Sequence, residues 1–198
     1  MVYQKDVVYQ KSSQRHAAKR TVAISKAFDN AFSDRSRFQI DLGWFALYGS
    51  AEDNTEDMLA FIDANYESEV SDLIDEISMT GYYGFPGDIP EDASVTEILD
   101  LLESDIPNYY GTYDALANEY GLNLAVYEGG DNTSKGGSGS TNSMDDRVRA
   151  ARDQGMTDLI EENIQNRFYP QGGDLYMYFT LTSGYNRYGT WGATDDIN

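Results

Sequence analysis

Residues 122–130 read LNLAVYEGG, a short apolar run that ends in a glutamate and two glycines. The run has the length and apolar character of a buried strand, and the two glycines predict a sharp turn after it. Glu128 then stands at the carboxyl end of that strand. A carboxylate in this place is either a hydrated charge at a strand end or a group that faces a substrate.

Helical and strand-like segments alternate on both sides of this run. Apolar residues recur with helical spacing in five segments, and short aromatic or apolar runs predict three further strands. Ser94 and Glu97 have the spacing of a capping box at the start of the third helix, which Pro107 ends. The predicted helices cover residues 17–32, 55–66, 94–106, 113–120 and 145–169, and the strands cover 38–49, 73–84, 122–127 and 174–181.

This alternation predicts an α/β protein with a parallel sheet and right-handed crossovers, in one of two folds. One is a doubly wound open sheet, and the other is a section of a (β/α)8 barrel. No glycine-rich phosphate-binding motif follows any strand, which disfavours a nucleotide-binding open sheet. A complete barrel needs roughly 250 residues, more than the 198 of this chain. The barrel alternative therefore predicts a single partial barrel domain over 1–198, with a flexible Gly/Ser-rich loop at 131–146.

The composition disfavours several classes of function. The chain has 34 acidic and 14 basic residues, a formal net charge of −20, so its surface repels nucleic acids and anionic membranes. It has no cysteine and a single histidine, His16, which argues against thiolate or histidine-rich metal sites and against a Ser-His-Asp triad. We therefore expect neither a metal nor a cofactor. No apolar run approaches the roughly 18 residues of a transmembrane helix, so we expect no membrane insertion.

The predicted strand ends carry one carboxylate surrounded by aromatic residues. Ligands of parallel α/β proteins bind at the carboxyl ends of the strands. Those ends hold Tyr48, Tyr82, Tyr83, Tyr127, Glu128 and the aromatic segment 185–191. Aromatic faces stack on sugar rings, and carboxylates act at the anomeric carbon. This combination is typical of sugar-processing sites.

Four stretches resemble the C-terminal half of clan A-type (β/α)8 glycoside hydrolases, in particular cellulase-like extracellular barrels of bacteria. They are residues 9–32, 74–84, 120–130 and 172–198. The most specific parts are YEGG at 127–130 and YGTWGA at 188–193. The resemblance implies strands 5–8 of a barrel, completed by another chain, by a second copy or by absent sequence. It also implies a polysaccharide or oligosaccharide ligand and a location outside the cell or on a cell or virion surface, although no signal peptide is present in this chain.

The resemblance assigns a role to individual residues. Glu128 matches the nucleophile of retaining enzymes, Tyr82 the tyrosine that orients it, and Trp191 the tryptophan beneath the sugar. Tyr83, Tyr127 and Tyr188 are expected to line the substrate site.

One part of the family's machinery is missing. The family's acid/base carboxylate, usually preceded by asparagine, has no counterpart in the N-terminal MVYQKDVVYQ. The sequence thus predicts either a glycoside hydrolase-like segment acting on or binding a β-linked polysaccharide, or a non-catalytic carbohydrate-binding or structural protein of an extracellular filament, matrix or virion.

Overall fold

The computed structural model describes residues 2–43, 51–84, 89–90, 92–133, 144–186 and 189–195. The chain divides into two compact units. The first comprises Met1–Met79 with Gly111–Ala125, and the second comprises Thr80–Tyr110 with Val126–Asn198. Strands β2 and β3 contribute residues to both units.

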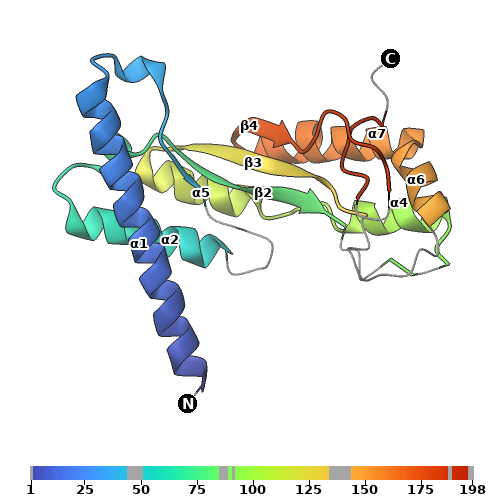
Figure 1. Ribbon diagram of the computed structural model, residues 1–198, viewed down its shortest axis with the longest axis horizontal. Coiled ribbons are helices and arrows are strands. Elements are labelled where there is room, and N and C mark those ends of the chain that lie inside the picture. Colours follow the sequence, from blue (N-terminus) through green and yellow to red (C-terminus); the bar gives the residue numbers. More distant parts are fainter. Residues whose placement is uncertain are drawn as a thin grey trace. The chain divides into compact units, whose positions relative to one another are not determined.

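The described strands form one parallel sheet with helices between successive strands (Figure 1). The strands are β1 (Asp41–Gly43), β2 (Glu76–Tyr83), β3 (Asn123–Asp131) and β4 (Gly173–Tyr178). Their order in the sheet is β1-β2-β3-β4, so each strand lies beside the one that precedes it in the chain. The predicted α/β class and parallel sheet are confirmed. The reversal of strand order that defines a doubly wound sheet does not occur among these four strands.

The first unit contains the N-terminal helices. Helix α1 (Val2–Ala31) packs on α2 (Ala51–Asn65), and η1 (Arg35–Arg37), α3 (Val70–Leu73) and α5 (Tyr110–Tyr120) complete the set. Both long helices bury one apolar stripe, which includes Val22 on α1 and Leu59 on α2. The Asp75 carboxylate accepts hydrogen bonds from the Ile40 N–H at 2.6 Å and from Arg35 at 2.9 Å. These bonds tie the start of β1 to the start of β2.

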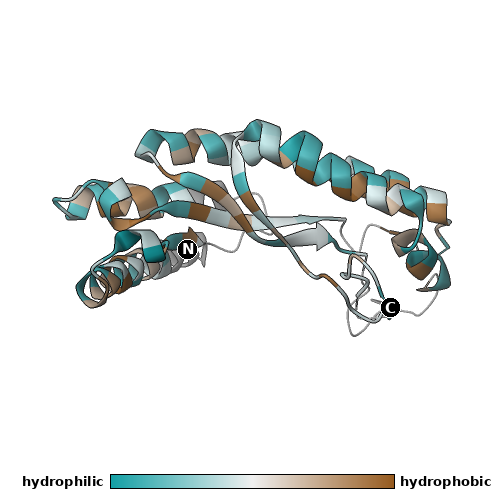
Figure 2. Ribbon diagram, turned by 90° about the horizontal axis from the view of Figure 1, so that it is seen from above, coloured by the Kyte–Doolittle hydropathy of each residue, from teal (hydrophilic) through white to brown (hydrophobic). Residues whose placement is uncertain are grey.

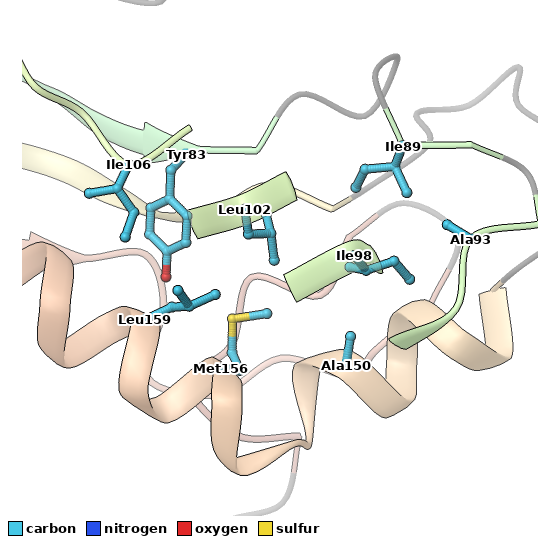
Figure 3. Close-up of a cluster of buried hydrophobic side chains, with 9 residues drawn as sticks. All are labelled: Tyr83, Ile89, Ala93, Ile98, Leu102, Ile106, Ala150, Met156 and Leu159. Atoms are coloured by element: carbon cyan, nitrogen blue, oxygen red, sulfur yellow. The ribbon is translucent and has the colours of Figure 1, made fainter. Parts of the chain in front are cut away.

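The second unit encloses an apolar core between the end of β2 and the helices α4, α6 and α7, and the described part of the unit contains five helical segments in all. These are α4 (Val95–Ser104), α6 (Met144–Ala151), α7 (Gln154–Glu161) and the π-helical η2 (Glu162–Phe168), followed by the turn η3 (Tyr169–Gln171). In Figure 3 the ring of Tyr83 points from β2 toward Leu159 and Met156, and Leu102 of α4 lies beside them. The predicted capping box is present, since Ser94 and Glu97 bond each other's backbone N–H groups at the start of α4.

The predicted long helix at 145–169 is interrupted. Asp153 stops α6 from continuing, because its carboxylate accepts a hydrogen bond from the Gly155 N–H at 2.8 Å and caps a new helix, α7. The loop predicted at 131–146 is also shorter at both ends than expected. Asp131 is the last residue of β3, and Met144 begins α6, while 134–143 lie outside the described residues.

Three predicted strands are shorter than expected, and the strand predicted at 73–84 forms β2 only over Glu76–Tyr83. Of the strand predicted at 38–49, residues 41–43 form β1 and 44–50, which include Tyr48, lie outside the described residues. The last strand ends at Tyr178 instead of at 181. Figure 2 shows pale and brown stretches along the strands, with some teal residues between them, and mixed teal and brown residues on the helices. This is the pattern of largely buried strands covered by amphipathic helices.

Candidate functional site

Glu128 and Tyr82 lie close together near the ends of β3 and β2. Both side chains are half-buried. Burial is the main cause that raises the pKa of the Tyr82 phenol, and the negative charge of Glu128 raises it further, followed by smaller effects of Tyr127 and Asp131. The phenol therefore stays protonated at physiological pH and can donate a hydrogen bond to a neighbouring carboxylate. Tyr82 and Glu128 thus lie near enough to interact electrostatically, and the orienting role of Tyr82 stays a prediction.

Trp191 is attached to the ends of two strands. The Thr180 N–H, just beyond β4, donates to the Trp191 carbonyl at 2.7 Å, and the Ala193 N–H donates to the Thr180 carbonyl at 2.8 Å. The indole N–H donates to Oδ1 of Asn132, the residue after β3, at 3.4 Å. The indole ring also meets the Phe179 ring edge-on, with 6.2 Å between ring centroids. Trp191 is half-buried, so part of its ring can contact a ligand.

A buried carboxylate, Asp131, ends β3 beside these residues. Its side chain accepts a hydrogen bond from the Tyr178 hydroxyl at 2.9 Å and one from the Thr190 hydroxyl at 3.1 Å. The Thr190 hydroxyl also bonds the Thr133 hydroxyl. Burial raises the pKa of Asp131 to about 6, and the two hydroxyl donors lower it by less than burial raises it. Asp131, which is 1 % exposed, thus links β3 by hydrogen bonds to β4 and to the segment that carries Trp191.

The chain just after Asp131 is held by a buried cation. The Arg147 guanidinium of α6 donates to the backbone carbonyls of Thr133 and of Ile89, the latter at 3.1 Å. Burial lowers the pKa of this guanidinium. Because Arg147 is completely buried, removing its side chain would leave both carbonyls without this partner.

A second polar network lies deeper in the same unit. The Tyr176 hydroxyl donates to the Gly81 carbonyl at 2.7 Å and accepts from the Asn163 amide at 2.9 Å. The Asn163 carbonyl oxygen accepts from the Tyr110 hydroxyl at 2.9 Å. A Cβ added at Gly129 would lie 2.5 Å from the Tyr176 hydroxyl, so only glycine allows this approach. The turn predicted at Gly129 is wrong: β3 continues to Asp131, and the glycine makes room for a tyrosine.

The other residues predicted to contact a ligand differ in their burial. Tyr127 is half-buried on β3 and stays a candidate. The role predicted for Tyr83 is wrong, because its side chain is 0 % exposed and packs in the apolar core. Tyr188 lies outside the described residues.

Four residues of this network were not predicted from the sequence: Asp131, Asn132, Tyr178 and Thr190. The residues EGGD could have indicated Asp131 if the strand had been extended through the glycines, but Thr190 and Tyr178 carry no pattern that links them to it.

Other ligand sites are not evident in the described part of the chain. It contains no group of three or more His, Asp or Glu side chains placed to hold a metal ion. None of its helices is long and apolar enough to cross a membrane. Two open hollows of ≈ 420 and ≈ 510 Å³ lie over α4 and α7, and neither borders a predicted site residue.

The chain matches no protein-family model and no curated protein, so the interpretation of this site rests on its residues and their geometry.

Proposed function

We propose that this chain is a glycoside hydrolase-like half of a (β/α)8 barrel and that it binds a β-linked polysaccharide at the carboxyl ends of its strands. The observation that carries the proposal is the proximity of Tyr82 and Glu128 on neighbouring strands, with Trp191 held just beyond the ends of β3 and β4. A half-buried carboxylate and phenol lie together, and a half-buried indole is fixed at the ends of β3 and β4. Such a group offers a sugar a stacking face and polar partners.

The division of roles follows from the chemistry of glycoside cleavage. In a complete barrel, Glu128 attacks the anomeric carbon, and the glycosidic bond breaks as the leaving oxygen takes a proton from a second carboxylic acid. Tyr82 holds the attacking carboxylate in place, and Trp191 stacks beneath the ring. Water later cleaves the glycosyl–enzyme ester, with the second carboxylate acting as base.

Asp131 does not supply this second carboxylate. It is 1 % exposed, and Tyr178 and Thr190 each donate a hydrogen bond to one of its two oxygens. A leaving-group oxygen therefore has no path to it. Hydrolysis therefore requires an acid that lies outside the described residues.

Exposed apolar surface supports completion by a partner. In the first unit, an exposed row on and just after α1 comprises Ile24, Phe28 and Phe32, and the Phe28 and Phe32 rings contact each other and Phe38. In the second unit, a row on and just beyond β4 is exposed by 42 to 74 %: Leu175, Met177, Phe179 and Leu181. Apolar rows of this kind are typical of surfaces that a further chain or domain covers. The sequential strand order is that of a barrel segment.

One observation favours a non-catalytic alternative. Among the described residues at the ends of β2, β3 and β4, Glu128 is the only half-buried carboxylate, and the other, Asp131, is buried. A carbohydrate-binding or structural protein of an extracellular filament, matrix or virion would need the stacking face but no acid/base pair. On either alternative, the protein works outside the cell or on a cell or virion surface.

Reducing-sugar release from a panel of β-glucans, mannans and xylans tests the proposal. Each glycan is incubated with the wild type, with Glu128→Gln and with Glu161→Gln, which removes an exposed carboxylate on α7 as a control. Release that Glu128→Gln abolishes and Glu161→Gln preserves supports catalysis at Glu128. Binding without release supports the non-catalytic alternative. Release that survives Glu128→Gln, or the absence of both binding and release, contradicts the assignment of the site.

A further inference from the structure

We propose that Asp131 is the positioning residue of this site: in its ionised form it fixes the segment 189–191 against the ends of β3 and β4 and thereby holds the Trp191 ring in its binding orientation. The inference rests on the proposed role of Trp191 in stacking on a sugar. It assigns to a buried carboxylate, which touches no ligand, a control over the residue that does.

The hydrogen bonds around Asp131 form a closed path. Asp131 accepts from Tyr178 on β4 and from Thr190, and the Thr190 hydroxyl also bonds that of Thr133 just after β3. Trp191 follows Thr190 directly in the chain. The indole N–H bonds Asn132, which follows Asp131 directly. Asp131 and Asn132 therefore bond Thr190 and Trp191, two consecutive residues of the C-terminal segment. These two bonds leave the indole ring little freedom to rotate.

Burial and close packing keep this contact specific. Thr190 is 1 % exposed, as is Asp131, so water does not replace either partner. A Cβ at Gly130 would lie 2.9 Å from the Tyr178 ring, and Gly130 has φ of 141°, so a side chain there would push Tyr178 away from Asp131. A Cβ at Gly189 would lie 2.4 Å from the Trp191 ring. Two glycines of the YEGG and YGTWGA stretches therefore clear space for the two ends of the contact.

The groups that face Asp131 make its protonation state decisive. The titratable side chains whose pKa its charge affects are all phenols, two on β2, one on β4 and one in the C-terminal segment: Tyr82, Tyr83, Tyr178 and Tyr185. The nearby cation of α6, Arg147, donates to the Thr133 and Ile89 carbonyls. Ionised Asp131 accepts from two hydroxyls. Protonated Asp131 must donate from one oxygen, so at least one of these hydroxyls has to turn round or lose its bond.

The fluorine NMR signal of Trp191 tests the inference in the complete chain. The protein is labelled with 5-fluorotryptophan, and Trp44→Phe identifies which of the two tryptophan signals belongs to Trp191. We expect the Trp191 signal to shift between pH 4.5 and 8 with a midpoint near the pKa of about 6 of Asp131. Asp131→Asn should abolish the titration. Asp174→Asn, which removes an exposed carboxylate of β4, should leave it unchanged.

A matched pair at the partner residue covers the case in which Asp131→Asn does not fold. Thr190→Val removes the hydroxyl at nearly constant volume, and Thr190→Ser keeps it. Thr190→Val should broaden or shift the Trp191 signal at pH 7.5, whereas Thr190→Ser should not. A Trp191 signal that does not titrate in the wild type, that titrates equally in Asp131→Asn, or that responds equally to both threonine variants overturns the inference.

Sugar binding separates this inference from the proposed function. Loss of a charge-assisted hydrogen bond that orders the stacking residue should weaken binding by about tenfold. We therefore expect the wild type to bind a β-linked oligosaccharide about tenfold more weakly at pH 5 than at pH 7.5, and Asp131→Asn to bind equally weakly at both. If the Trp191 signal titrates through Asp131 but no oligosaccharide binds, the positioning role stands and the proposed function fails. If oligosaccharide binds with no dependence on Asp131, the proposed function stands and this inference fails.

Discussion

Strands β2 and β4 belong to the same sheet but have opposite surroundings. Every residue of β2 is buried except Tyr82, which is half-buried, whereas no residue of β4 is buried and its apolar residues alternate with half-buried tyrosines. Tyr176 and Tyr178 turn toward the polar networks of the second unit, and the side chains of Leu175, Met177 and Phe179 are exposed. The difference indicates that both faces of β2 are covered within this chain, whereas one face of β4 is exposed and suited to contact with a further chain or domain.

The largest expected effect contrasts an apolar side chain on each strand. Ile77→Ala on β2 should lower the free energy of unfolding by about 2–5 kcal/mol, because Ile77 is completely buried and leaves a cavity. Met177→Ala on β4 should change it by less than about 0.5 kcal/mol, since Met177 is 45 % exposed. Urea unfolding of the isolated chain measures both. Equal losses would show that the exposed face of β4 is covered in solution, and the contrast between the strands would be lost.

The next effect concerns Asp131 at the end of β3. Its pKa in the folded protein, about 6, lies above its ordinary value of 3.8, so the folded state holds this proton more tightly than the unfolded state. The contribution of Asp131 to stability is therefore highest below pH 4 and falls as the pH rises to about 6, by up to about 3 kcal/mol. The difference in unfolding free energy between the wild type and Asp131→Asn should follow this curve. A difference that does not vary between pH 4 and 7 would refute the burial effect.

A smaller effect distinguishes two tyrosines, the half-buried Tyr178 on β4 and the buried Tyr83 on β2. Tyr178→Phe removes the donor to the Asp131 carboxylate and should destabilise the protein by about 1.5–3 kcal/mol at pH 7.5. The hydroxyl of Tyr83 is buried and has no hydrogen-bond partner among the described residues. Tyr83→Phe should therefore be neutral or stabilise by up to about 1 kcal/mol. Thermal unfolding of both variants in parallel provides the check, and a Tyr83→Phe loss as large as that of Tyr178→Phe would reverse the comparison.

The sequence predicts local features of this fold better than tertiary ones. The capping box at Ser94 and helices α2, α4 and α5 depend on spacing within a few residues, and they lie close to where the sequence indicates them. Helix α1, by contrast, begins at Val2 instead of residue 17, and the helix predicted at 145–169 is divided. The break at Asp153 could have been found too, since aspartate is a favoured N-cap residue. The glycines after Glu128 placed the predicted end of this strand too early. A glycine that makes room for a tyrosine is indistinguishable in sequence from a glycine that forms a turn.

The candidate site divides in the same way. Glu128, Tyr82 and Trp191 follow from a motif and from strand ends, and the structure brings Glu128 and Tyr82 together and fixes Trp191 at the ends of β3 and β4. Tyr83 was assigned to the site because it neighbours Tyr82. Adjacent residues of a strand point to opposite faces, and only the packing of α4 and α7 determines which face is the core. The link from Asp131 to Thr190 spans 59 residues and cannot be predicted without the fold.

Binding of a soluble β-linked oligosaccharide, measured by calorimetry, tests the central claim most directly. The titration compares the wild type with Trp191→Ala and with Tyr169→Ala, which removes an exposed aromatic ring of η3 as a control. The account predicts that the wild type and Tyr169→Ala bind one of the β-glucan, mannan or xylan oligosaccharides with similar affinity and that Trp191→Ala binds at least about tenfold more weakly. Wild-type protein that binds none of them, or Trp191→Ala that binds as well as the wild type, would contradict it.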